Sequence, residues 1–188
     1  MRKEFRDVLA LDNVSLEIKD REYVSIIGPS GCGKSTLLKC LAGIIKQDSG
    51  QIFIGDMEVT ALPPEERQLG YMFQEIALFP HMSAWENIEY GPRVRGKTRQ
   101  ATREFVGQIM ELTRLKIAPD TYPDELSGGA GQKTALARAI AAEPHLMLLD
   151  EPLGALDAHV RAVLRYELRR LVNELGLTAI HVTHDQEE

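Results

Sequence analysis

The sequence YVSIIGPSGCGKSTLLKCLAGII, residues 23–45, decides the fold. Its first part, 23–28, is a short apolar run that ends at a glycine, which predicts a buried β-strand. Apolar residues recur at helical spacing over 34–45, which predicts a helix. The loop between them matches G-x-x-x-x-G-K-[ST], a pattern that cradles phosphate when a strand precedes it and a helix follows. The residues at its fixed positions are Gly28, Gly33, Lys34 and Ser35.

The chemistry of this loop favours a bound nucleotide. Backbone N–H groups from Ser30 to Ser35 can point at phosphate oxygens because Gly31 and Gly33 tolerate the required dihedral angles. The helix N-terminus adds partial positive charge. Lys34 is expected to reach the β- and γ-phosphates, and Ser35 to bind Mg²⁺. A plain glycine-rich turn is the alternative, which the flanking strand and helix disfavour. The predicted binding residues are Gly28, Pro29, Ser30, Gly31, Cys32, Gly33, Lys34, Ser35 and Thr36.

A second apolar strand, LMLLDE over 146–151, ends in two carboxylates. Asp150 is expected to hold Mg²⁺, directly or through water. Glu151 is then placed to polarise an attacking water as a general base. Many buried strands end in an aspartate that only makes a turn, so this prediction depends on the phosphate loop.

Two further strands end in side chains that suit the same site. Gln74 follows the strand residues YMF, and its amide could touch both the metal and the attacking water without adding charge. His184 follows AIHVT, and its imidazole could donate to a γ-phosphate. From the residues alone, an exposed loop glutamine and a strand-end histidine without a role stay open as alternatives. His181 lies on the same strand and is predicted to be structural.

A second anion cradle follows about a hundred residues after the first, in ELSGGAGQK over 125–133. Ser127 is a good helix N-cap, and Gly128 and Gly129 let the backbone approach a ligand. One small domain does not need two such cradles for one nucleotide.

The rest of the chain predicts an α/β domain with a mainly parallel sheet and a helical insert. The capping box of Ser83 and Glu86 starts a helix, and an amphipathic helix follows over 98–115 without an intervening strand. We therefore expect a core over 1–74 and 127–188 and a helical subdomain over 75–126. Further strands are expected at 14–18, 50–56, 69–73, 145–150 and 178–184, and a further helix at 159–175.

Composition limits the partners. Hydrophobic residues make up 44% and charged residues 27% of 188, which fits a soluble globular chain. A net charge of −6 makes free nucleic acid an unexpected partner. Cys32 and Cys40 fit a reducing compartment without a disulfide framework. No signal peptide or spanning apolar run is visible, so we expect a cytoplasmic chain that reaches a membrane through a partner.

Taken together, these stretches resemble the nucleotide-binding subunit of ABC (ATP-binding cassette) transporters over essentially the whole chain. GPSGCGKSTLL, LFPHMSAWENI, LDEPLGALD and VTHDQEE look like bacterial or archaeal importers that depend on a binding protein. The matching parts, in order, are the phosphate loop at 28–36, Gln74 as the Q-loop, LSGG at 126–129 as the signature, LMLLDE as the Walker B strand, GALD at 154–157 as the D-loop, and THD at 183–185 with His184 as the switch histidine.

The resemblance implies a P-loop NTPase (ABC ATPase) core with a small antiparallel β subdomain, and it implies ATP and Mg²⁺. In this family two cassette subunits pair head to tail, so Ser127, Gly128 and Gly129 would bind the γ-phosphate held by the partner. Phe5 matches the aromatic that stacks on adenine, although a small core aromatic is the alternative. The implied partners are a second cassette, permease subunits at the cytoplasmic face of the membrane and, indirectly, a solute-binding protein.

The sequence also departs from the family pattern. Ala130 stands where the family has a glutamine, and Gly131 costs about 1 kcal/mol of helix stability relative to alanine. The chain stops soon after His184, so we expect the C-terminal part of the usual cassette to be absent. A nucleotide-binding module with little hydrolysis therefore stays an alternative to a transport ATPase. A non-transport ABC ATPase is disfavoured by the short insert and by the lack of a basic stripe.

Overall fold

The centre of the molecule is a four-stranded parallel sheet in the order β3-β8-β7-β6. The computed structural model describes residues 1–154 and 156–185. The mainly parallel sheet that the sequence predicts is therefore confirmed. The strands are β3 (Tyr23–Ile27), β6 (Leu69–Met72), β7 (Leu146–Asp150) and β8 (Thr178–Thr183).

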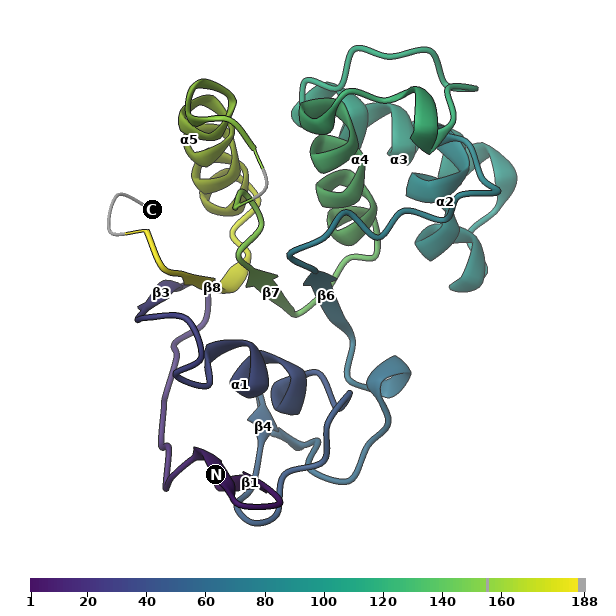
Figure 1. The fold of residues 1–188 in the computed structure, drawn as a ribbon. Helices are drawn as coiled ribbons and strands as arrows, with labels where there is room; N and C mark the ends of the chain where they lie inside the picture. The colour runs from purple at the N-terminus through teal and green to yellow at the C-terminus, as the bar shows by residue number, and fades with distance from the viewer. Residues whose placement is uncertain (155, 186–188) are drawn as a thin grey trace.

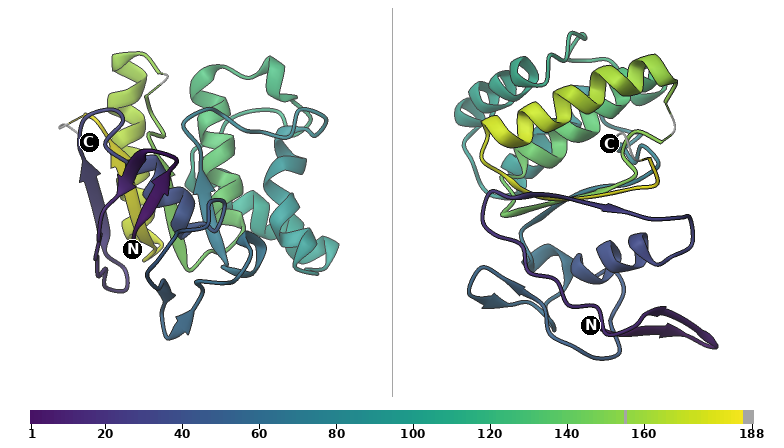
Figure 2. Two further views of the ribbon diagram at one scale, coloured as in Figure 1. Left: turned by 60° about the horizontal axis from the view of Figure 1, so that its bottom comes forward. Right: turned by 90° about the vertical axis from the view of Figure 1, so that its left-hand side faces the viewer.

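Helices cover both faces of this sheet. Helix α1 (Lys34–Leu41) lies on one face, and α4 (Gly128–Ala141) and α5 (Ala158–Glu174) lie on the other (Figures 1 and 2). The side chains of strand β7 alternate between the two faces of the sheet, so both faces carry apolar residues that pack against helices. Leu148 packs in a cluster with Leu38 of α1, whereas Met147 and Leu149 pack with residues of α4 and α5. All three strand residues are fully buried.

The segment after β6 forms helices α2 (Ala84–Val94) and α3 (Arg99–Leu112), which pack beside α4 (Figure 1). The predicted capping box is confirmed, because Ser83 N–H donates to Glu86 Oε2 at 2.8 Å and Glu86 N–H donates to Ser83 Oγ at 3.3 Å. Ile88 and Val106 share one buried cluster with residues of α4 and β7. The division into a core and a helical subdomain over 75–126 stays a prediction.

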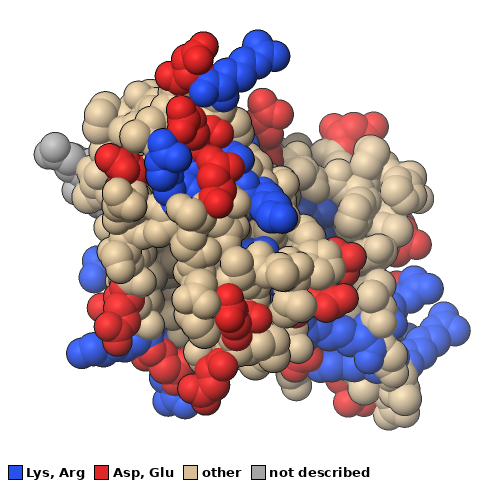
Figure 3. All heavy atoms as spheres, turned by 90° about the horizontal axis from the view of Figure 1, so that it is seen from below, with Lys and Arg blue, Asp and Glu red and all other residues tan. Residues whose placement is uncertain are grey.

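Small antiparallel hairpins lie below the sheet, beyond α1 (Figure 2). Seen from below, the molecule carries acidic and basic side chains side by side (Figure 3). One ion pair of the N-terminal hairpin joins Lys3 Nζ to Asp48 Oδ1 at 2.8 Å. Two short 3₁₀ helices, η1 (Pro64–Glu66) and η2 (Pro123–Glu125), complete the described structure. The hairpins pair β1 (Lys3–Phe5) with β2 (Val8–Leu11) and β4 (Phe53–Ile54) with β5 (Met57–Glu58).

Several predicted elements differ from the structure. Residues 14–18 form no strand, since Val14 N–H bonds to the carbonyl of Met1 while the Ile18 side chain packs against a buried cluster. The alternating pattern there marks neither a strand nor a fully buried face, because Leu16 is 51% exposed. Within the predicted strand 50–56, only Phe53–Ile54 is paired. Strand β3 was expected to be buried, but it pairs only with β8 in the described sheet, and Ile27 is 50% exposed.

Helix α1 ends at Leu41, earlier than the predicted residue 45. Gly43 adopts a φ of 76°, which ends the helix in a left-handed turn. Arg67 then caps the helix, because its Nη1 donates to the carbonyls of Cys40 at 2.9 Å and Leu41 at 2.8 Å. Within residues 1–154 and 156–185, no helix is both long enough and apolar enough to span a bilayer.

Candidate functional site

The phosphate loop connects β3 to α1, as the sequence predicts. Gly31 and Gly33 have φ values of 82° and 96°, a region in which other residues are strained. A Cβ placed on Gly33 would collide with the carbonyl oxygen of Ala10 in β2, so the loop and the N-terminal hairpin fit closely. Lys34 is 7% exposed, and its Nζ donates to the carbonyls of Gly28 at 2.7 Å and Pro29 at 3.0 Å. The ammonium group is thus held over its own loop.

Asp150 lies at the carboxyl end of β7 and is 4% exposed. Ser35 Oγ donates to its Oδ1 at 2.7 Å, and the Tyr71 hydroxyl donates to its Oδ2 at 3.0 Å. Two of the three predicted metal residues, Ser35 and Asp150, therefore lie in direct contact, whereas the third, Gln74, contacts Glu151. Among the described residues no group of three or more His, Cys, Asp or Glu side chains gathers to hold a metal. Mg²⁺ is commonly bound by one or two protein ligands together with substrate phosphates, and this pair of oxygen donors fits that arrangement.

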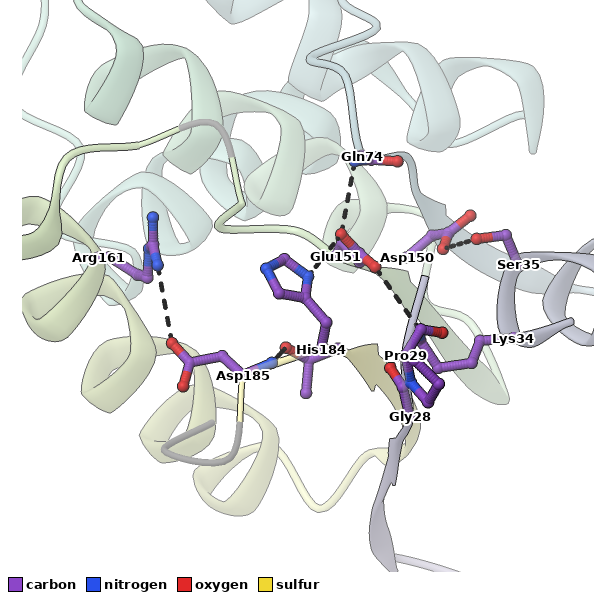
Figure 4. A network of polar contacts seen from close by, with 11 residues as sticks. Gly28, Pro29, Lys34, Ser35, Gln74, Asp150, Glu151, Arg161, His184 and Asp185 are labelled. Carbon is purple, nitrogen blue, oxygen red and sulfur yellow. Dashed lines mark hydrogen bonds and ion pairs between the residues drawn. The ribbon is translucent and has the colours of Figure 1, made fainter. Parts of the chain in front are cut away.

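The Glu151 carboxylate lies close to three other predicted site residues, His184, Gln74 and Lys34 (Figure 4). Its Oε2 lies 3.0 Å from His184 Nδ1 and accepts from Gln74 Nε2 at 3.4 Å, and its Oε1 lies 3.9 Å from Lys34 Nζ. Gln74, Glu151 and His184 lie just after three strands of the sheet, and Lys34 begins α1 after the loop that follows the fourth. Glu151 itself has a φ of 44°, strained for a residue other than glycine, and its N–H bonds to the carbonyl of Val182 at 2.9 Å.

The second cradle stands apart from the first within the chain. Ser127 caps α4 by accepting from Ala130 N–H at 3.3 Å. Helices α1 and α4 lie on opposite faces of the sheet (Figure 1). Among the described residues, no hydrogen bond or ion pair connects 127–129 with the phosphate loop.

The structure gives less support to the predicted role of Phe5 and to two of the predicted motifs. Phe5 lies on β1 with 41% of its surface exposed, and Lys3 Nζ lies 5.1 Å from its ring centre. Its stacking on adenine stays a prediction. The predicted D-loop includes Ala155, and the motif after His184 includes residues 186–188, all of which lie outside the described residues. His181, predicted to be structural, is buried with its Nδ1 2.7 Å from the Tyr23 hydroxyl.

Sequence reasoning missed Tyr71 and Gln132. Burial, and then the nearby Asp150 carboxylate, raise the pKa of Tyr71 far above its ordinary value, so its hydroxyl remains a donor. Gln132 is buried on α4, and its Nε2 donates to the carbonyl of Pro152. The helix behind the second cradle is therefore linked to the segment directly after Glu151. Only the register of β6 on β7, which the sequence does not give, could have indicated Tyr71.

Comparison with known proteins identifies the family and the fold. A family model described as ABC transporter matches residues 11–154. The chain belongs to the ABC transporter family. Its fold is that of the family's ATP-binding cassettes. A solved structure described as the dimeric structure of MJ0796, a bacterial ABC transporter cassette, has a TM-score of 0.85 at 33% identity, covering 99% of this chain and 86% of that one. A structure of MJ0796 in a post-hydrolysis state bound to ADP and Pi has a TM-score of 0.84 at 32% identity, covering 99% and 85%.

Curated relatives within the family are also similar. The sulfate/thiosulfate import ATP-binding protein CysA of Xanthomonas campestris pv. campestris is 47% identical over 192 residues, which cover 100% of this chain and 56% of the relative. The spermidine/putrescine import ATP-binding protein PotA of Marinobacter nauticus is 45% identical over 188 residues, covering 100% and 50%. The chain spans about half the length of the curated relatives it matches.

Proposed function

We propose that this chain binds and hydrolyses ATP and thereby powers the import of a solute across the cytoplasmic membrane. The observation that carries the proposal is the convergence of Lys34, the Ser35–Asp150 pair and Glu151 at one edge of the sheet. Relatives named import ATP-binding proteins, and a similar cassette described with ADP and Pi, support the same chemistry.

Each side chain has a role in this reaction. Lys34 leaves the loop carbonyls and binds the terminal phosphates together with the loop N–H groups. Ser35 and Asp150 would hold Mg²⁺, which would neutralise phosphate charge. Glu151 accepts a proton from the attacking water. Gln74 and His184 orient that water and respond to the γ-phosphate.

The second cradle indicates how ATP binding becomes movement. Ser127, Gly128 and Gly129 do not serve the phosphate loop of their own chain, so we propose that they bind the γ-phosphate held by a partner cassette. A head-to-tail pair of this kind closes on ATP and opens after hydrolysis. The dimeric form of the similar cassette supports this arrangement. The helical segment 75–126 would pass the motion to the permease.

The location and the remaining partners follow from this role. We propose attachment to the cytoplasmic face of the membrane through permease subunits, with a solute-binding protein acting indirectly and no nucleic acid involved. Two similar relatives are named for sulfate or thiosulfate and for spermidine or putrescine, solutes of opposite charge. We therefore expect solute selectivity to lie in the permease and binding protein.

The turnover of Mg-ATP measured against protein concentration tests this function. If two chains share each ATP, the rate per chain is expected to rise with concentration until the dimer is saturated. A flat, low rate with ATP bound to a monomer would favour the alternative of a nucleotide-binding module without useful hydrolysis. A rapid rate from a protein that stays monomeric in Mg-ATP would contradict the shared site.

A further inference from the structure

Tyr71 makes a contact that the proposed reaction does not use. It lies on β6, opposite Leu148 of β7, and its hydroxyl reaches the Asp150 carboxylate two residues farther along that strand. The tyrosine ring also packs on Phe73, with ring centres 4.3 Å apart. The hydroxyl is thus directed by a ring that a neighbouring side chain holds in place.

Asp150 depends on this contact for its orientation. The terminal torsion of an aspartate side chain has a broad energy well, so the carboxylate plane is set by its hydrogen-bond partners. Here Ser35 holds one oxygen at 2.7 Å and Tyr71 holds the other at 3.0 Å. With Asp150 only 4% exposed, water is a poor substitute for either donor.

We propose that Tyr71 is a positioning residue that sets how tightly the site takes Mg²⁺ with the nucleotide. By holding Oδ2 of Asp150, the Tyr71 hydroxyl keeps Oδ1 turned toward Ser35. Asp150 Oδ1 and Ser35 Oγ are then both directed at the place proposed for the metal ion. This inference rests on the proposed function, because it assigns a role within that nucleotide site. Partners of metal ligands commonly act in this way, by fixing the ligand's orientation.

The Tyr71→Phe variant separates positioning from packing, because it keeps the ring on Phe73 and removes only the hydroxyl. The affinity for ATP is measured by calorimetry in EDTA and again over a series of Mg²⁺ concentrations. We expect the affinity in EDTA to stay unchanged while the gain that Mg²⁺ provides falls by about tenfold, the lower end of what loss of such a partner costs. The Mg²⁺ concentration for half-maximal gain is expected to rise accordingly.

Tyr23→Phe is the matched control. The Tyr23 hydroxyl lies 2.7 Å from His181 Nδ1 in the same sheet, away from Asp150, so its loss should leave the Mg²⁺ dependence unchanged. An unchanged Mg²⁺ gain in Tyr71→Phe would overturn the inference. So would an equal loss of affinity with and without Mg²⁺ accompanied by a lower melting temperature, which would make the hydroxyl merely structural. A wild-type protein that binds no ATP at all would overturn the proposed function itself, a separate and recognisable result.

Discussion

Replacing Lys34 with alanine is expected to lower the affinity for Mg-ATP by about 100-fold, as for the loss of one partner of a buried charge pair. The wild-type ammonium is 7% exposed and is held by two loop carbonyls, so it is already desolvated and positioned before phosphate arrives. Phosphate oxygens then replace neutral carbonyls as its partners, and each new bond is assisted by charge. Alanine is compatible with the first turn of α1, but its side chain has no hydrogen-bond donor for phosphate. Calorimetric titration with Mg-ATP measures the difference.

Lys39 provides the control for this variant. It lies in the last turn of the same helix, away from the loop, so Lys39→Ala should bind Mg-ATP like the wild type. The melting temperature of both variants shows whether α1 remains folded. An affinity of Lys34→Ala within threefold of the wild type would remove the lysine from the phosphate site.

Glu151→Gln is expected to lower ATP turnover by about 100-fold or more, the range that a general base contributes, while leaving ATP binding intact. Glutamine keeps the shape of the side chain but cannot accept a proton from water. Because hydrolysis is what opens the proposed pair, the variant should also accumulate as an ATP-bound dimer. Size-exclusion chromatography in Mg-ATP, together with phosphate release, measures both effects.

Glu143→Gln is a close control for the chemistry. Glu143 also has a left-handed φ, 47°, and also pairs with a lysine, since its Oε2 lies 2.6 Å from Lys97 Nζ. It precedes β7 instead of following it, so it lies at the opposite edge of the sheet. Its variant should turn over ATP normally. Wild-type turnover in Glu151→Gln would mean that another group activates the water.

The sequence was sufficient to predict which of these side chains meet at one edge of the sheet. Asp150 ends a strand, Glu151 and His184 follow one, and Lys34 comes after the loop that leaves another. The carboxyl ends of parallel strands meet at one edge whatever the register between them. Their convergence is therefore independent of details that a sequence does not contain.

Contacts that depend on register or on tertiary pairing were not predictable in this way. The bond between Tyr71 and Asp150 requires β6 to lie beside β7 with Tyr71 opposite Leu148. The alternating residues of 14–18 give the pattern of a strand, yet nothing local shows that a partner strand is missing. The capping of the last carbonyls of α1 depends on Arg67, which reaches the helix from a distant segment.

The role of the second cradle could not be predicted from its residues alone. Local chemistry predicts that Ser127 and the following glycines bind an anion, but it does not indicate which chain holds that anion. The family resemblance supplied a partner chain, and the separation of α4 from the phosphate loop across the sheet is consistent with it.

The most direct test of the shared site is ATP turnover by an equal mixture of Lys34→Ala and Ser127→Asp proteins. Aspartate caps a helix as well as serine does, so α4 should stay folded while the carboxylate repels the partner's γ-phosphate. Each variant alone is expected to be inactive, because both of its composite sites are damaged. If chains pair at random, mixed dimers each retain one intact site, and turnover recovers to roughly a quarter of the wild-type rate. A mixture as inactive as its components, with Ser127→Asp still folded and able to bind ATP, would contradict a site shared between two chains.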